Sequence, residues 1–130
     1  MKKILSEYIV RMDDINYGGH MGNEKALQVF NDARVYYLKQ LGSSELDIGG
    51  GIGVIIAEAN IKYIKEVLLH DILETEVWVS DVTGLKWTIS YKTKRKRDDE
   101  VVFIGTTVLI SFDYHRKKVV KIPEDFLKKI

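Results

Sequence analysis

The amino-acid sequence predicts an α+β fold in which a long central helix is wrapped by a curved antiparallel sheet of about five strands. Two observations lead to this prediction. Apolar residues recur at helical spacing near the start of the chain, and four long segments of strand character follow. The length of 130 residues fits one domain, so we expect a single domain over residues 1–130.

The first 22 residues are expected to form a strand and then an irregular segment. Apolar and polar residues alternate weakly over residues 4–12, which favours a strand. Residues 13–22 combine two aspartates, an asparagine, three glycines and a histidine. Such a concentration of polar and small residues indicates either a functional site or a capped turn before a helix.

A helix is predicted from about residue 22 to residue 41. Its apolar positions repeat at helical spacing on one face, and they are Ala26, Phe30, Ala33 and Tyr37. Gly42 follows the periodic residues and is typical of a helix C-terminus. A glycine-rich loop over residues 42–53 comes next. It follows a helix and enters a strand, which is the reverse of the order that a phosphate-binding loop requires.

The rest of the chain is predicted to form long antiparallel strands. They cover residues 54–63, 73–82, 86–94 and 101–112, and a short extension with a terminal turn follows. In the first of these strands the apolar residues alternate with polar ones. We expect one face to hold Ile55, Ala57, Ala59, Ile61 and Tyr63, and the other to hold Glu58, Asn60 and Lys62.

Composition excludes several classes of function. Twenty Lys and Arg against nineteen Asp and Glu leave a net charge of +1, which argues against nucleic-acid binding through a basic surface. No cysteine is present, and His20, His70 and His115 lack the spacing of metal ligands, so no metal site is expected. No apolar run approaches a membrane span or a signal peptide. We therefore expect no membrane association and a cytoplasmic location.

The sequence also resembles a known family. DDINYGGHMGNEKALQVFNDARVYYLKQLG resembles the opening of the hotdog-fold acyl-CoA thioesterases of the 4-hydroxybenzoyl-CoA thioesterase type. The typical pattern of that family is an Arg or another polar residue, D-x-D, a few residues, G-H-x-N-N and then a helix with an acidic residue, Ala and Arg. The positions that match here are Arg11, Asp14, Gly19, His20, Asn23, Phe30, Asp32, Ala33 and Arg34. EANIKYIKEVLLHD and VVFIGTTVLISFDYHRKKVVKIPEDF resemble the later strands and the ending of the family.

The resemblance implies an acyl-CoA thioesterase that works as a homodimer or homotetramer, with the thioester at the interface between subunits. The substrate would be a thioester of coenzyme A or of acyl carrier protein, with no further cofactor. The backbone N–H of Asn23 would polarise the carbonyl, as suits a helix N-terminus. The substrate-binding residues before it would be Tyr17, Gly18, Gly19 and Gly22, since glycines let the backbone approach closely.

The resemblance departs from the family at the expected catalytic carboxylate. The second Asp of D-x-D falls on Asn16, which cannot take a proton at neutral pH. Several alternatives are open for the chemical step: the carboxylate of Glu58, Asp14 or Asp13 acts in its place, or His20 is the base. Alternatively, Asn16 and the Asn23 N–H position a water, or the protein binds thioesters without hydrolysing them. Structural roles stay open for the same residues: a turn cap for the aspartates, a helix-start contact for His20 and a solvated strand face for Glu58.

Residues 94–97 form a basic run, KRKR, that is a further candidate for substrate binding. Lys94 and Arg95 are expected to meet the phosphates of coenzyme A, although a solvated hairpin tip explains the run equally well. The function expected from the sequence is thus acyl-CoA thioester hydrolysis. A non-catalytic acyl-thioester or lipid-binding dimer is the alternative, and a hotdog dehydratase or hydratase fits less well.

Overall fold

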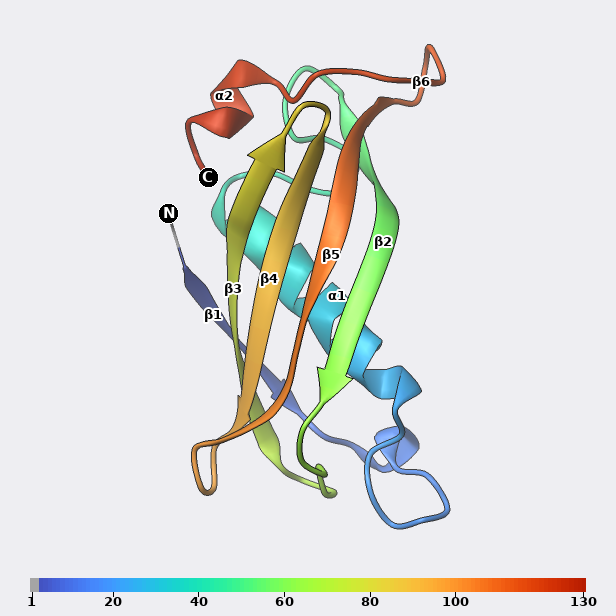
Figure 1. Cartoon of the computed structure of the whole chain (residues 1–130), viewed down its shortest axis with the longest axis vertical. Coiled ribbons are helices and arrows are strands. Elements are labelled where there is room, and N and C mark those ends of the chain that lie inside the picture. Colours follow the sequence, from blue (N-terminus) through green and yellow to red (C-terminus); the bar gives the residue numbers. More distant parts are fainter. Residues whose placement is uncertain (1–2) are drawn as a thin grey trace.

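A 17-residue helix and a six-stranded antiparallel sheet are the main elements of the computed structural model, which describes residues 3–130 (Figure 1). In chain order the elements are β1 (Ile4–Ile9), the 3-10 helix η1 (Met12–Asp14), α1 (Glu24–Gln40), β2 (Gly53–Tyr63), β3 (Ile72–Thr83), β4 (Lys86–Arg95), β5 (Glu100–Asp113), β6 (Lys118–Val119) and α2 (Glu124–Leu127). The strand order is β1-β3-β4-β5-β2, and the two-residue β6 pairs with the end of β5. The predicted fold class is confirmed, with β6 as a sixth strand.

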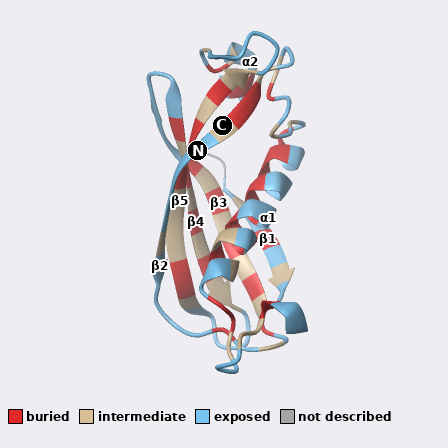
Figure 2. Ribbon diagram, turned by 90° about the vertical axis from the view of Figure 1, so that its right-hand side faces the viewer, coloured by how far each residue is buried: buried red, intermediate tan, exposed pale blue. Residues whose placement is uncertain are grey.

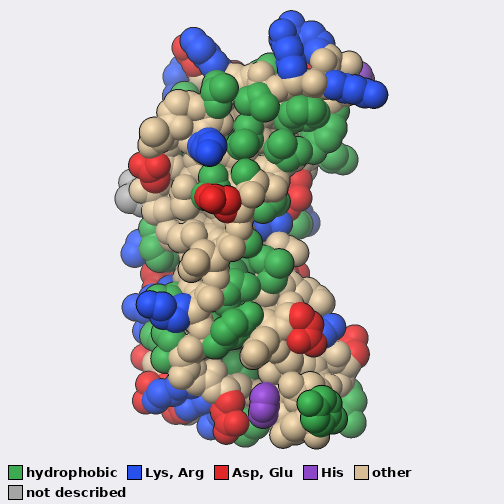
Figure 3. Space-filling model, turned by 45° about the vertical axis from the view of Figure 1, so that its right-hand side comes forward, with side chains coloured by type: hydrophobic (Ala, Val, Ile, Leu, Met, Phe, Trp, Pro, Cys, Tyr) green, Lys and Arg blue, Asp and Glu red, His purple; other side chains and the backbone are tan. Residues whose placement is uncertain are grey.

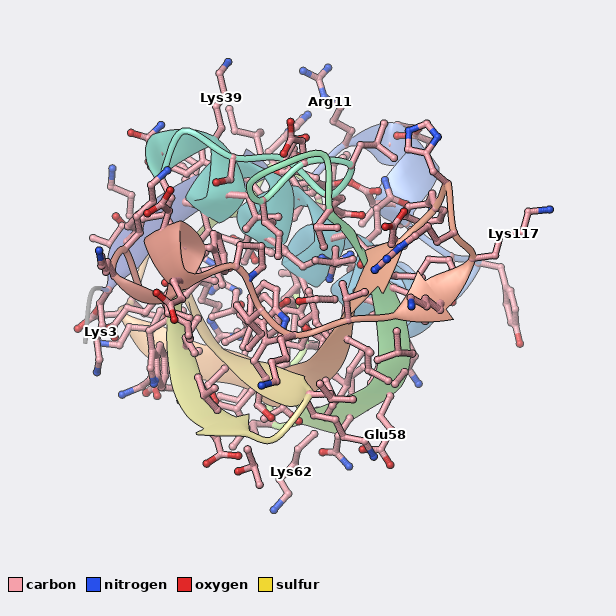
Figure 4. The ribbon with its side chains drawn as sticks, turned by 90° about the horizontal axis from the view of Figure 1, so that it is seen from above. Lys3, Arg11, Lys39, Glu58, Lys62 and Lys117 are labelled. Atoms are coloured by element: carbon pink, nitrogen blue, oxygen red, sulfur yellow. The ribbon has the colours of Figure 1, made fainter. Side chains whose placement is uncertain are left out.

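The apolar face of α1 packs on the concave side of the sheet, which curves around the helix (Figures 2 and 4). Phe30 is fully buried, and its ring stacks on Tyr91 at 4.4 Å between centroids. Gly105 of β5 lies beneath this ring. A Cβ at Gly105 would overlap the Asn60 carbonyl oxygen and the Phe30 ring, so only glycine permits this approach of helix to sheet.

The end of α1 follows the predicted pattern. Gly42 has a φ of 72°, its N–H donates to the Lys39 carbonyl, and the Ser43 N–H donates to the Leu38 carbonyl. These two hydrogen bonds satisfy carbonyls that the helix leaves open at its end. The prediction that Gly42 ends the helix is confirmed.

The first strand is shorter than predicted. β1 ends at Ile9, and the chain turns into η1 instead of continuing as a strand to residue 12. Two hydrogen bonds close this turn: the Arg11 N–H donates to the Asp14 carboxylate at 3.0 Å, and the Asp14 N–H donates to the Arg11 carbonyl at 3.0 Å. A local side-chain acceptor therefore competes with the strand, as aspartate often does.

A β-bulge in β2 makes the faces of this strand differ from those predicted. Ile56 and Glu58 pair with consecutive residues of β5, and Ala57 between them has no partner. The second half of the strand has the predicted orientation, because Ile61 lies opposite Gly105, which faces α1. The extra residue reverses the first half, so the prediction that Ile55 shares a face with Ile61 is wrong.

Arg34 is a charged residue in the interior. It is 3% exposed, and its guanidinium donates to the Glu45 carboxylate at 3.0 Å, to the Tyr91 hydroxyl at 3.3 Å and to Asn31 Oδ1 at 2.8 Å. These partners compensate the loss of hydration that a buried charge suffers. They also tie the middle of α1 to the loop that precedes β2.

Candidate active site

The loop before α1 is anchored by Asp14. Its side chain is 3% exposed and accepts hydrogen bonds from the Tyr8 hydroxyl, at 2.9 and 3.0 Å to the two oxygens, and from the Arg11 N–H. Its carbonyl accepts the Gly22 N–H at 3.0 Å. Burial and then the hydrogen bond to Asp14 raise the pKa of Tyr8 to about 12. The geometry favours a structural role for Asp14, because its carboxylate is fully engaged.

Asn16 occupies a turn of its own. Its side-chain oxygen accepts the Gly18 N–H at 2.9 Å, and its backbone N–H donates to the His20 carbonyl at 2.9 Å. The amide oxygen is therefore committed to the loop, and an amide has no proton-accepting role at neutral pH. Tyr17 between these contacts projects fully into solvent, and Gly19 has a φ of 84°.

His20 lies beside this turn. A Cβ on Gly18 would stand 3.3 Å from His20 Nε2, so the imidazole and the turn are in close proximity. His20 Nδ1 lies 3.3 Å from the Met21 carbonyl oxygen, which can only accept. In the neutral ring Nδ1 therefore carries the proton, and Nε2 keeps its lone pair.

The start of α1 offers hydrogen-bond donors. Asn23 precedes the helix with helical backbone angles of −59° and −35°, and its side chain makes no capping hydrogen bond. Within residues 3–130, the N–H groups of Asn23 and Glu24 have no acceptor. The Tyr63 hydroxyl donates to the Asn23 carbonyl at 2.9 Å and holds this peptide from the side of β2. Open N–H groups at the positive end of a helix suit an oxygen that gains negative charge.

A pocket of about 240 Å³ opens at this helix start. It is lined by residues 20–23 and 63–67, together with Ala26 and Phe103. Of the residues predicted from the sequence, it brings together His20, Gly22 and Asn23. The predicted residues outside its lining are Asp14, Asn16, Tyr17, Gly18, Gly19, Glu58, Lys94 and Arg95.

Glu58 lies on the opposite side of the sheet from this pocket. It is exposed on β2 directly after the bulge. Figure 4 shows its side chain, and that of Lys62, pointing away from α1. Within one chain, Glu58 therefore does not face the Asn23 N–H.

The two basic residues predicted to meet phosphates are engaged in ion pairs. Lys94 pairs with Asp99 at 3.6 Å, and Arg95 pairs with Asp98 at 2.8 Å. Hydrogen bonding to Arg95 lowers the pKa of the Asp98 carboxyl. Arg95 Nη1 also donates to the Glu66 carbonyl at 2.7 Å. Arg95 thus fixes the backbone beside the pocket, and its guanidinium has protein partners.

The sequence did not single out two residues of the pocket, Tyr63 and Glu66. Alternation along the strand predicts the face on which Tyr63 lies, but no sequence pattern indicates its contact with Asn23. Glu66 lies in the connection between β2 and β3. The Met21 N–H donates a hydrogen bond to the Val67 carbonyl of this connection at 2.7 Å. This contact spans 46 residues, so no local pattern reveals it.

Residues 3–130 contain no group of three or more His, Asp or Glu side chains arranged to hold a metal ion. No helix in the same range has the length and apolar character required to cross a membrane.

Comparison with known proteins identifies the family. The sequence profile described as the thioesterase-like superfamily matches residues 10–130. No curated protein sequence matches the chain.

Several solved structures share the fold. A 1,4-dihydroxy-2-naphthoyl-CoA thioesterase from Synechocystis aligns with a TM-score of 0.89 and 15% identity, over 99% of this chain and 96% of that one. A DHNA-CoA thioesterase from Staphylococcus aureus aligns with a TM-score of 0.88 and 21% identity, over 99% and 89%. A hypothetical protein from Staphylococcus aureus in complex with CoA aligns with a TM-score of 0.86 and 15% identity, over 98% and 81%. The chain belongs to the thioesterase-like superfamily and has the hotdog fold.

Proposed function

We propose that this protein hydrolyses acyl thioesters of coenzyme A, with the thioester carbonyl bound by the N–H of Asn23. The observation that carries the proposal is the pocket of about 240 Å³ at the start of α1, whose lining includes Asn23, the residue whose N–H has no acceptor among residues 3–130. Such donors stabilise the oxyanion that forms when water attacks a carbonyl. Membership of the thioesterase-like superfamily supports the same reaction class.

The proposal includes a homodimer in which a second copy completes the pocket. Two features support it. β2 is an edge strand, and Ile56, Tyr63 and Ile64 on or beside it are 41–49% exposed. Figure 3, which brings the β2 side forward, shows hydrophobic side chains running along this face. The cavity of one protomer is also smaller than the roughly 300–1,000 Å³ of ordinary ligand sites. A solution mass of two or four protomers supports this part, and a mass of one protomer contradicts it.

Thiol release from a panel of acyl-CoAs tests the activity. The panel contains aromatic and aliphatic acyl groups of short and long chain, and the wild-type protein should release free coenzyme A from at least one of them. No turnover combined with tight binding of one member would support the alternative, a non-catalytic acyl-thioester-binding dimer.

The role of the Asn23 N–H has its own test. Proline at position 23 is compatible with the observed φ of −59° and removes the N–H. Asn23→Pro should therefore lower kcat by about 100-fold, as expected for the loss of one oxyanion donor. Asn23→Ala is the comparison variant because it keeps the N–H and deletes only a side chain that makes no capping bond. Equal kcat values for the two variants would exclude the N–H as the donor.

A further inference from the structure

Glu66 is an acidic residue in the pocket that no pattern in the sequence assigns to a role. It lines the cavity together with His20 and Asn23. Its side chain is exposed and forms no ion pair or hydrogen bond with any of residues 3–130. The neighbouring Lys65 does not neutralise it, because the Lys65 ammonium pairs with Glu100 at 3.2 Å.

The backbone brings Glu66 to the helix start by a specific contact. The Met21 N–H donates to the Val67 carbonyl at 2.7 Å, and both Met21 and Val67 are buried against the core. His20 and Glu66, each one residue before a member of this pair, are thereby brought close together, and both line the pocket.

Two interactions hold the Glu66 backbone in place. Arg95 Nη1 donates to the Glu66 carbonyl at 2.7 Å, and the same guanidinium is fixed by Asp98. The preceding residue, Lys65, donates its N–H to the Val102 carbonyl at 3.1 Å. Glu66 thus stands on an anchored segment that lines the pocket, and its carboxylate has no ion pair or hydrogen bond with any of residues 3–130.

The other acidic residues near the loop do not meet these conditions, and Asp13 lies outside the pocket lining. Asp14 is buried and hydrogen-bonded to Tyr8 and Arg11, and Glu58 points away from α1 (Figure 4). The carboxylate of Glu24 lies over Gly22 and outside the pocket lining. Asn16 carries no carboxylate at all.

We propose that Glu66 supplies the general base that Asn16 does not provide; this inference rests on the proposed thioesterase function. The Glu66 carboxylate takes a proton from water while the water oxygen bonds to the thioester carbonyl carbon. The carbonyl electron pair moves onto its oxygen, which the Asn23 N–H stabilises. When the C=O bond re-forms, the C–S bond breaks, and the proton passes from Glu66 to the departing sulfur. The products are a carboxylic acid and free coenzyme A.

Thiol release by Glu66→Gln, assayed on the best acyl-CoA of the panel, tests the inference. Glutamine keeps the size of the side chain but cannot accept the proton, so kcat should fall by about 100-fold or more while KM changes little. Glu66→Asp should retain part of the activity. The acid limb of the wild-type pH–rate profile should disappear in Glu66→Gln. Glu124→Gln, on α2 at the far end of the molecule, is the matched control.

The outcomes separate this inference from the proposed function. A wild-type protein that hydrolyses no acyl-CoA overturns the proposed function itself. An active wild type with an equally active Glu66→Gln variant overturns only the inference, and a large loss in His20→Gln would then identify the imidazole as the base. A loss in Glu66→Gln that appears in KM alone would also contradict it, because that result describes substrate binding and not proton transfer.

Discussion

Replacement of Asp14 should destabilise the fold and leave the chemical step intact. Its carboxylate is 3% exposed and accepts hydrogen bonds from the Tyr8 hydroxyl and the Arg11 N–H. Asp14→Ala leaves both donors without an acceptor, and each part-buried unpaired donor costs about 1–2 kcal/mol. The free energy of unfolding should therefore fall by about 2–4 kcal/mol.

Denaturant unfolding of a double-mutant cycle measures this effect. The cycle contains Asp14→Ala, Tyr8→Phe and the double variant, and the coupling energy between the two sites should be about 1–2 kcal/mol. Asp14→Asn is the milder comparison, since it keeps one acceptor oxygen and should lose about half as much stability.

One result would refute the reasoning. If Asp14→Asn unfolds at the wild-type denaturant concentration but loses about 100-fold in kcat, the carboxylate takes part in proton transfer. The structural assignment of Asp14 would then be wrong. Activity is compared at a temperature where every variant is folded, so that loss of structure does not count as loss of catalysis.

Three further predictions concern other parts of the molecule. Gly105→Ala should lower the free energy of unfolding by about 3 kcal/mol, because its Cβ overlaps the Asn60 carbonyl oxygen, and a loss under about 0.5 kcal/mol by denaturant unfolding would contradict this. The raised pKa of Tyr8, about 12, means that its stabilising contribution is complete below the unfolded pKa of 10 and is lost as pH rises through the folded value. The difference in unfolding free energy between wild type and Tyr8→Phe should therefore shrink from pH 10 to pH 12, and a constant difference would count against it. Asn16→Asp keeps the acceptor for the Gly18 N–H, and its kcat in the thiol-release assay should stay near the wild-type value; a gain of about 100-fold would show that the wild type lacks a working carboxylate.

Long periodic elements could be predicted from the sequence because each contains its own signal. The spacing of Ala26, Phe30 and Tyr37 repeats over several turns, and Gly42 ends the helix by a local backbone conformation. The predicted end of β1 was wrong because the Asp14 carboxylate accepts a local hydrogen bond and the chain turns into η1. The predicted faces of the first half of β2 were wrong because a bulge depends on the pairing strand, which the alternation of residues does not reveal.

The candidate site was predictable only where its residues are contiguous. His20, Gly22 and Asn23 lie within four residues of each other, and the family pattern covers them. Glu66 reaches the same pocket through a hydrogen bond between segments far apart in the chain. The acidic partners of Lys94 and Arg95 lie in the same turn of the sequence, as Asp99 and Asp98, but only the geometry of the hairpin shows that they pair.

The bulge in β2 gives this strand one residue more than the facing stretch of β5 requires. Ala57 is the surplus position, and on both sides of it the pairing with β5 is regular. Loss of Ala57 would leave a continuous ladder, and all remaining side chains of β2 would keep their present side of the sheet. Loss of a residue closer to the pocket would reverse Tyr63 unless the bulge moved along the strand to absorb the change. The strand thus tolerates a change in chain length at Ala57, which precedes Tyr63, the residue whose hydroxyl holds the start of α1, in the same strand.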